Sequence, residues 1–170
     1  MTGLERNADV VRMASYAPLF AHTDAWQWMI NLIWTDNLRV MPTPSYHVQR
    51  LFARNRGDRV LPVSASELVG DEAKRFFASA TFDEASGEVI VKLVNATGKT
   101  SASQVDLAGV GEVKRGTITV LRGENLEAIN TLDVPNHIAP RETVFAPAAT
   151  KFAVTLPANS FTVLRLGVGK

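Results

Sequence analysis

Residues 25–51, AWQWMINLIWTDNLRVMPTPSYHVQRL, mark the point at which the patterning of this chain changes from helical to strand-like. The stretch holds all three tryptophans of the chain, Trp26, Trp28 and Trp34. Trp26 and Trp28 are two positions apart, so an extended segment would place both indoles on one side. Such a cluster either fills a core or forms a wall on which a flat ligand stacks. Large aromatic side chains more often fill cores, so a core is the favoured interpretation and a ligand wall the alternative.

The residues before the tryptophans carry apolar side chains near helical spacing, with charged side chains on the other side. This pattern predicts an amphipathic helix over residues 3–21. Pro18 should kink or end that helix, because proline has no N–H and its ring excludes the carbonyl four residues earlier. Asn31-Leu32-Ile33-Trp34 then reads as a short buried strand.

A second helix is predicted immediately after the tryptophan stretch. Thr43 can cap it, and Pro44 suits its first position because the missing N–H would have no partner there. Residues 55–57, Asn-Arg-Gly, supply the stop. The expected buried stripe of this helix is Tyr46, Val48, Leu51 and Phe52.

From Arg59 onward the hydrophobic period changes to two. Residues 77–82 and 88–94 flank a turn with a glycine at position 87, which predicts a β-hairpin. Residues 130–147 are rich in proline and polar side chains and are expected to form an irregular connection. The last strand should have partners on both sides. Further strands are expected at residues 103–107, 116–121, 151–156 and 161–166. The predicted fold class is mainly β, an antiparallel sandwich of jelly-roll type preceded by two helical segments.

Composition excludes several kinds of protein. The 170 residues carry a formal charge of +1, which gives no reason to expect nucleic acid or an acidic membrane surface as partner. The chain has no cysteine, so disulfides and thiolate chemistry are absent, and the compartment stays open. No run of about 20 apolar residues suggests a membrane span. The first ten residues lack the apolar core of a secretory signal, and the helical pattern begins so early that the start looks cut.

Metal and nucleophile chemistry find little support in the sequence. The three histidines, His22, His47 and His137, are far apart, and His22 with Asp24 is better explained as a loop hydrogen bond than as a metal site. Ser15, together with His22 and Asp24, has the residue types of a triad, but no glycine-flanked turn presents the serine. We therefore expect no metal and no cofactor.

Acid pairs were sought because two carboxyl groups on rigid supports suffice for glycoside hydrolysis. The pairs Asp71-Glu72 and Asp83-Glu84 lie in charged turn segments, where water keeps both groups ionised. A basic run at Arg50, Arg54, Arg56 and Arg59 is better explained as a solvated helix face than as a nucleic-acid patch. The sequence offers no convincing acid and nucleophile.

Three runs of sequence resemble one family of enzymes. These are residues 3–20 (GLERNADVVRMASYAPLF), the tryptophan stretch with residues 43–52 (TPSYHVQRLF), and the closing residues 156–166 (LPANSFTVLRL). Together they resemble the C-terminal part of glycoside hydrolase family 51 α-L-arabinofuranosidases, over essentially the whole chain. The first run is highly specific, whereas many accessory sandwiches of glycosidases end in a motif like the last.

The resemblance implies a chain in two parts. Residues 1–58 would be the end of a truncated (β/α)8 barrel with its linker, and residues 59–170 the C-terminal sandwich. The acid/base and nucleophile glutamates of that family would lie upstream of Met1, so this chain alone is expected to be inactive. The implied partners are the upstream catalytic barrel and an arabinose-containing oligosaccharide or polysaccharide.

The resemblance also implies which residues border the sugar in the parent enzyme: Tyr16, Trp26, Gln27 and Trp28. Packing between barrel and sandwich is the competing explanation for these side chains. Met29-Ile30 stands where a Thr-Pro or Asn-Pro pair would be expected, which puts the local loop geometry in question.

Three roles therefore stay open. The chain is the structural C-terminal portion of an α-L-arabinofuranosidase, a sandwich module that binds carbohydrate or a partner without catalysis, or a fragment with no independent role. A fragment that has lost its barrel would expose apolar surface, so we expect self-association.

Overall fold

The computed structural model describes residues 1–65 and 74–169. Its N-terminal part contains helix α1 (Thr2–Arg6), the short strands β1 (Phe20–His22), β2 (Ile33–Thr35) and β3 (Val40–Pro42), and helix α2 (Pro44–Arg54). The described residues after α2 form β4 (Arg59–Leu61), β5 (Phe76–Asp83), β6 (Glu88–Asn95), β7 (Ser101–Asp106), β8 (Glu112–Val113), β9 (Gly116–Arg122), β10 (Arg141–Phe145), β11 (Lys151–Leu156) and β12 (Ser160–Gly169).

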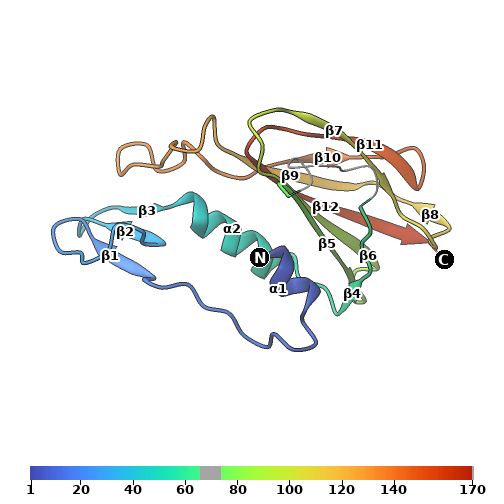
Figure 1. Cartoon of the computed structure of the whole chain (residues 1–170), viewed down its shortest axis with the longest axis horizontal. Helices are drawn as coiled ribbons and strands as arrows, with labels where there is room; N and C mark the ends of the chain where they lie inside the picture. The colour runs from blue at the N-terminus through green and yellow to red at the C-terminus, as the bar shows by residue number, and fades with distance from the viewer. Residues whose placement is uncertain (66–73, 170) are drawn as a thin grey trace.

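One antiparallel sheet organises the molecule. Its strands run in the order β10-β9-β12-β6-β5-β4, and β8 pairs with the end of β12. The closing strand β12 lies between β6 and β9, as the sequence predicted. Helices α1 and α2 lie on one side of this sheet and the two-stranded sheet β11-β7 on the other (Figure 1). The predicted mainly β, antiparallel sandwich preceded by two helical segments is confirmed.

Alternation along the central strands builds two cores. Ile90, Phe161 and Val163 face Leu51 and Phe52 of α2, and the rings of Phe52 and Phe161 stack with centroids 5.0 Å apart. On the opposite face the neighbouring residues of the same strands, among them Val89, Val91, Leu164 and Leu166, pack with Phe152 of β11. Because side chains of a strand alternate between its two faces, a single sheet supplies both cores.

The strands β1, β2 and β3 form a small separate sheet at the other end of the molecule from β12 (Figure 1). In this sheet β1 pairs with β2 in parallel, and β3 pairs with β2 antiparallel. The connection between β9 and β10 reaches back to it. There Asn130 Nδ2 donates to the Pro42 carbonyl at 2.9 Å, and Arg39 Nη1 lies 2.6 Å from Asp133 Oδ1.

The predicted helix over residues 3–21 is present at its start but is wrong beyond Arg6. Helix α1 ends at Arg6, turns follow at Asn7, and the chain is extended by Phe20, where it pairs with β2. The apolar periodicity does not correspond to a buried face, because Val10 and Phe20, two positions of its apolar side, are 72% and 59% exposed. An amphipathic pattern of this kind forms a helix where its apolar side has something to cover.

The other predicted elements are largely correct. Helix α2 begins after Thr43, whose hydroxyl accepts from the Tyr46 N–H at 3.3 Å, and it ends at Arg54 before Asn55. The β5–β6 hairpin has Gly87 at φ +67° in its turn. The expectation for residues 130–147 is wrong in part, because β10 lies within them and pairs with β9 from Arg141↔Val120 to Phe145↔Gly116. Across the described residues, no helix has the length and apolar character needed to cross a membrane.

Candidate functional site

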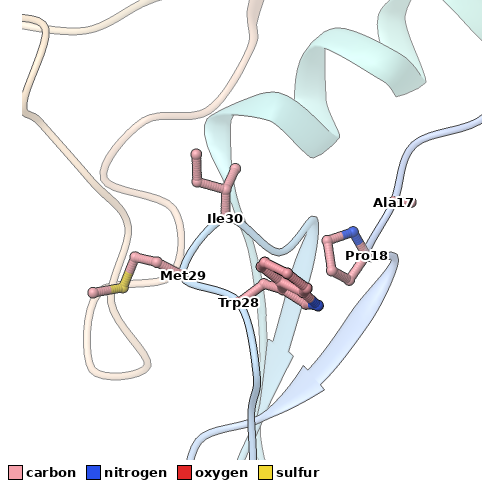
Figure 2. A pocket seen from close by; sticks show the side chains of 5 residues that line it. All are labelled: Ala17, Pro18, Trp28, Met29 and Ile30. Atoms are coloured by element: carbon pink, nitrogen blue, oxygen red, sulfur yellow. The ribbon is translucent and has the colours of Figure 1, made fainter.

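A shallow apolar cavity of about 510 Å³ lies beside the β1–β3 sheet, and five residues line it: Ala17, Pro18, Trp28, Met29 and Ile30. Figure 2 shows the Trp28 indole next to the Pro18 ring, whereas Met29 and Ile30 point in other directions. Trp28 is 66% exposed, so a molecule in solution can reach the face of its ring.

Backbone pairing at the start of β1 and β2 brings the two walls of the cavity together. The N–H of Leu32 donates to the Pro18 carbonyl at 3.1 Å, and the N–H of Ile33 donates to the Leu19 carbonyl at 3.0 Å. Asn31, which is buried, donates from its side-chain amide to the Trp28 carbonyl. Residues 17–18 and 28–30 are therefore held side by side although nine residues separate them in the chain.

Only one of the four residues that the resemblance implies at the sugar is among the described residues that line this cavity. Trp28 lines the cavity, but Tyr16, Trp26 and Gln27 are not among its lining residues. Tyr16 is half-buried and Gln27 is exposed. Residues 26–30 form no strand, so the strand alternation that would place Trp26 and Trp28 on one side does not apply to them.

Trp26 instead contacts Trp34 edge-on, with ring centroids 5.8 Å apart and planes at 77°. Trp26 is 45% exposed and Trp28 is more exposed still, so the favoured interpretation of these two indoles as core residues is wrong. Both residues lie in the loop between β1 and β2, outside the two cores of the sandwich.

The chemistry of the cavity is that of a contact surface. None of its five lining side chains is ionisable, and the indole N–H of Trp28 is the hydrogen-bond donor among them. Such a surface can pack on the apolar face of a flat ring, and it cannot transfer protons. The sequence indicates Pro18 only as a residue that ends a helix, and Met29-Ile30 only as a departure from the family pattern. Neither feature identifies these residues as part of a cavity.

The other groups singled out in the sequence have structural partners. His22 Nε2 lies 3.1 Å from Asn37 Oδ1, and His22 Nδ1 accepts from the Asp24 N–H at 3.2 Å, which confirms the loop hydrogen bond. Asp83 accepts from Ser86, Ala85 and Arg165. Hydrogen bonds from Ser86, and after them one from Arg165, lower the pKa of Asp83, so this carboxyl stays ionised.

The remaining candidates divide between the described part of the chain and the part outside it. Glu84 forms an ion pair with Arg59, with Oε1 3.0 Å from Nε. Asp71 and Glu72 lie outside the described residues. Among residues 1–65 and 74–169 there is no group of three or more His, Asp or Glu side chains that could hold a metal ion.

His47 is a buried polar residue that the sequence did not explain. It is 4% exposed, and neither ring nitrogen has a hydrogen-bond partner. Burial, and to a lesser degree the nearby charge of Arg50, lowers the pKa of His47, so the ring is neutral at pH 7. Its position on α2 beside Tyr46 is away from the cavity lining.

Comparison with known sequences gives one consistent result. Residues 1–160 match the protein family described as the α-L-arabinofuranosidase C-terminal domain. The chain is 36% identical over 166 residues to the probable α-L-arabinofuranosidase A of Aspergillus oryzae, covering 96% of this chain and 25% of that protein. It is 32% identical over 167 residues to α-L-arabinofuranosidase 1 of Arabidopsis thaliana, covering 95% of this chain and 24% of that protein.

Solved structures agree. An arabinose-bound GH51 α-L-arabinofuranosidase superposes with a TM-score of 0.88 at 33% identity, over 99% of this chain and 26% of the other. The arabinose complex of the Thermotoga maritima α-L-arabinofuranosidase superposes with a TM-score of 0.82 at 20% identity, over 96% of this chain and 36% of the other, and shows the fold alone. The chain thus spans about a quarter of the length of the curated relatives it matches.

Proposed function

Because the chain belongs to the α-L-arabinofuranosidase C-terminal domain family, we propose that it is the structural C-terminal portion of an enzyme acting on arabinose-containing polysaccharides. The reaction of that enzyme would be hydrolysis of terminal non-reducing α-L-arabinofuranosyl residues. In this proposal the catalytic glutamates come from a barrel that is not part of these residues, and the chain by itself does not catalyse hydrolysis.

The observation that carries this proposal is the match of residues 1–160 to the α-L-arabinofuranosidase C-terminal domain family. The five side chains that line the cavity beside the β1–β3 sheet add no ionisable group. Glycoside hydrolysis uses two carboxyl groups about 5–10 Å apart on either side of the sugar. Acids that the structure does describe near one another are tied to arginines: Asp83 and Glu88 both contact Arg165, and Asp36 and Asp133 both contact Arg39.

An activity assay with an aryl α-L-arabinofuranoside tests the catalytic part of the proposal. We expect no turnover above background by this polypeptide alone at any pH between 4 and 8. Appreciable turnover that survives repeated purification would show that the reactive carboxyls lie within these residues and would refute the proposal.

We propose further that the surface around Trp28 borders the sugar in the assembled enzyme. Trp28 and Pro18 offer an exposed apolar face, which suits stacking against the C–H face of a sugar ring. Tyr16, Trp26 and Gln27 lie in the same segment of the chain and stay proposed neighbours of the sugar. Packing against the barrel is the competing role for all four residues.

Titration of the chain with arabino-oligosaccharides, followed by tryptophan fluorescence, tests whether this chain binds sugar by itself through Trp28. Binding by the chain alone would favour the second candidate function, a non-catalytic carbohydrate-binding module, and Trp28→Ala should then abolish the signal. Trp34→Phe is the matched control, because Trp34 lies on β2, does not line the cavity and is not a proposed neighbour of the sugar. A flat response at millimolar sugar would remove the binding module and leave the structural role.

The proposed macromolecular partner is the catalytic barrel. Leu19 and Phe20 on and beside β1, and Met29 and Ile30 at the cavity, are exposed apolar residues of the N-terminal part. Strand β1 is the edge of a sheet whose β1–β2 pair is parallel, and parallel strands usually lie in sheets covered on both faces. A boundary between residues 1–58 and 59–170, with the first part completing the barrel, stays a prediction.

A further inference from the structure

Lys92 is a charged residue at the centre of the main sheet. It lies on β6, directly between Ser79 of β5 and Val163 of β12 in the strand register. Its side chain is fully buried, with 0% exposed, on the face of the sheet that carries the helices. Its neighbours along that face of β6, Ile90 and Val94, belong to the apolar core under α2.

Glu5 of α1 supplies the partner of this buried ammonium. Lys92 Nζ donates to Glu5 Oε1 at 2.6 Å, and Ser79 Oγ donates to Glu5 Oε2 at 2.5 Å. The Glu5 side chain is itself only 13% exposed. Both oxygens of one carboxylate are therefore bound by two side chains that stand opposite each other on neighbouring strands.

Further contacts tie the helices to the same place. The Arg6 guanidinium donates to the Ala78 carbonyl of β5 at 2.5 Å. The Lys92 ammonium lies 5.5 Å from the centroid of the Phe52 ring of α2, within the range of a cation–π contact. Residues from α1, α2, β5 and β6 thus meet around one charge.

A buried ammonium is costly without a partner, because the low-dielectric interior disfavours the charged form. Burial lowers the pKa of Lys92, and the hydrogen bond and charge of Glu5 act in the opposite direction. The partner comes from a site 87 positions away in the chain, on a helix of five residues that has little stability of its own. Lys92 therefore depends on Glu5 to offset its buried charge, and α1 depends on Lys92 for its attachment to the sheet.

We propose that Ser79 and Lys92 form a receptor for a single carboxylate, and that Glu5 seated in it anchors the N-terminal segment to the sandwich. Residues 1–6 then belong to the folding unit of the sandwich, and this inference competes with the predicted boundary at residue 58, which assigns them to the barrel. The anchor fixes the start of the segment that leads to Pro18 and the cavity. This inference does not rest on the proposed function, because it concerns stability and order in the chain as it exists.

Substitution of Glu5 by glutamine tests the anchor, because it keeps the shape of the side chain and removes its charge. We expect Glu5→Gln to lower the melting temperature by about 10 °C, the effect of leaving a buried charge unpaired in a chain of this size. The matched control is Glu84→Gln, since the Glu84–Arg59 pair has the same kind of contact with both side chains about 60% exposed. The control should shift the melting temperature by no more than about 2 °C.

The double variant Glu5→Met with Lys92→Met keeps the test decisive if Glu5→Gln does not fold. Removing both charges removes the burial penalty, so this variant should fold and regain at least half of the lost melting temperature. Amide hydrogen exchange adds a readout specific to the anchor. In Glu5→Gln, exchange at residues 4–11 should rise at least tenfold, while amides of the β7–β11 ladder should stay within about twofold under native conditions.

Three results would overturn the proposal. These are a melting temperature for Glu5→Gln no lower than that of Glu84→Gln, a double variant less stable than Glu5→Gln, and fast exchange at residues 4–11 in the unsubstituted chain. The first would show that the carboxylate adds no stability at this site, and the second would show that an unpaired charge on Lys92 is not the cause of the loss in Glu5→Gln. The third would show that the N-terminal segment is not held by it.

Discussion

His47 illustrates what a single residue contributes at the smallest scale. It lies on the buried side of α2, and neither ring nitrogen has a hydrogen-bond partner. An apolar side chain at this position would avoid the free-energy penalty of burying unpaired polar atoms. The sequence predicted a buried stripe of Tyr46, Val48, Leu51 and Phe52 on this helix. In the structure His47 is buried, whereas its neighbours Tyr46 and Val48 are half-buried. Nothing in the residue type itself indicates whether a histidine on a helix faces the core or the solvent.

The unpaired His47 predicts a pH dependence of stability. The folded-state pKa is depressed by burial, so the stability is fully present above the unfolded-state value of about 6.5 and is lost as the pH falls below it. The melting temperature should therefore drop between pH 7.5 and pH 5, and His47→Leu should reduce that drop. The positive charge of Arg50, three residues further along α2, also lowers the pKa of His47.

The control for this experiment is His137→Gln, because His137 is exposed. It should leave the pH dependence of the melting temperature unchanged. If His47→Leu shows the same drop as the unsubstituted chain, the loss at low pH belongs to other groups.

At the scale of the element, α2 is the segment in which local signals and tertiary contacts agree. Thr43 caps it and Pro44 begins it, as the sequence predicted. The Thr43 hydroxyl also donates to the Leu32 carbonyl at 2.8 Å, which ties the start of the helix to the chain just before β2. One side chain therefore serves both the helix and the small sheet.

Loss of this double contact should be measurable. Thr43→Ala removes the cap and the bond to Leu32, and we expect a loss of about 1–2 kcal/mol, or roughly 3–8 °C in melting temperature. Thr43→Ser keeps the hydroxyl and should lie within about 0.5 kcal/mol of the unsubstituted chain. Equal melting temperatures for the alanine and serine variants would contradict a capping role.

The sequence predicted an element well where residues within that element specify its structure. It predicted an element poorly where pairing with a distant strand specifies the structure. The β5–β6 hairpin and α2 contain their own turn and cap residues, so the sequence identified both. Strand β10 was missed because its residues are mostly exposed and its structure comes from pairing with β9. The long first helix was predicted from spacing alone, but apolar positions of that pattern such as Val10 cover nothing and are exposed, and the chain is already in β1 at Phe20.

At the scale of the whole molecule, exposed apolar side chains gather in the N-terminal part. Val10, Met13, Trp28, Met29 and Ile30 are all more than half exposed. A groove of about 290 Å³ between residues 1–14 and α2 is also lined mainly by apolar side chains. Surfaces of this kind associate when no partner covers them.

We therefore expect the isolated chain to self-associate. Light scattering at concentrations from about 5 to 200 µM should show a mass that rises above 18.5 kDa with concentration. The double variant Met13→Ser with Ile30→Ser should shift the association to higher concentration. A constant monomer mass at the highest concentration would show that these side chains do not form a contact between copies.

The sequence by itself determined the family, the sandwich and the capped second helix, because each depends on residues that are close together or on a pattern that repeats along the chain. Only the tertiary structure decided the short first helix, the position of Trp28 beside Pro18 and the seat of Glu5 between Ser79 and Lys92. These features join positions ten to 87 residues apart. Their energies come from burial and pairing across the fold, which no local pattern of residues records.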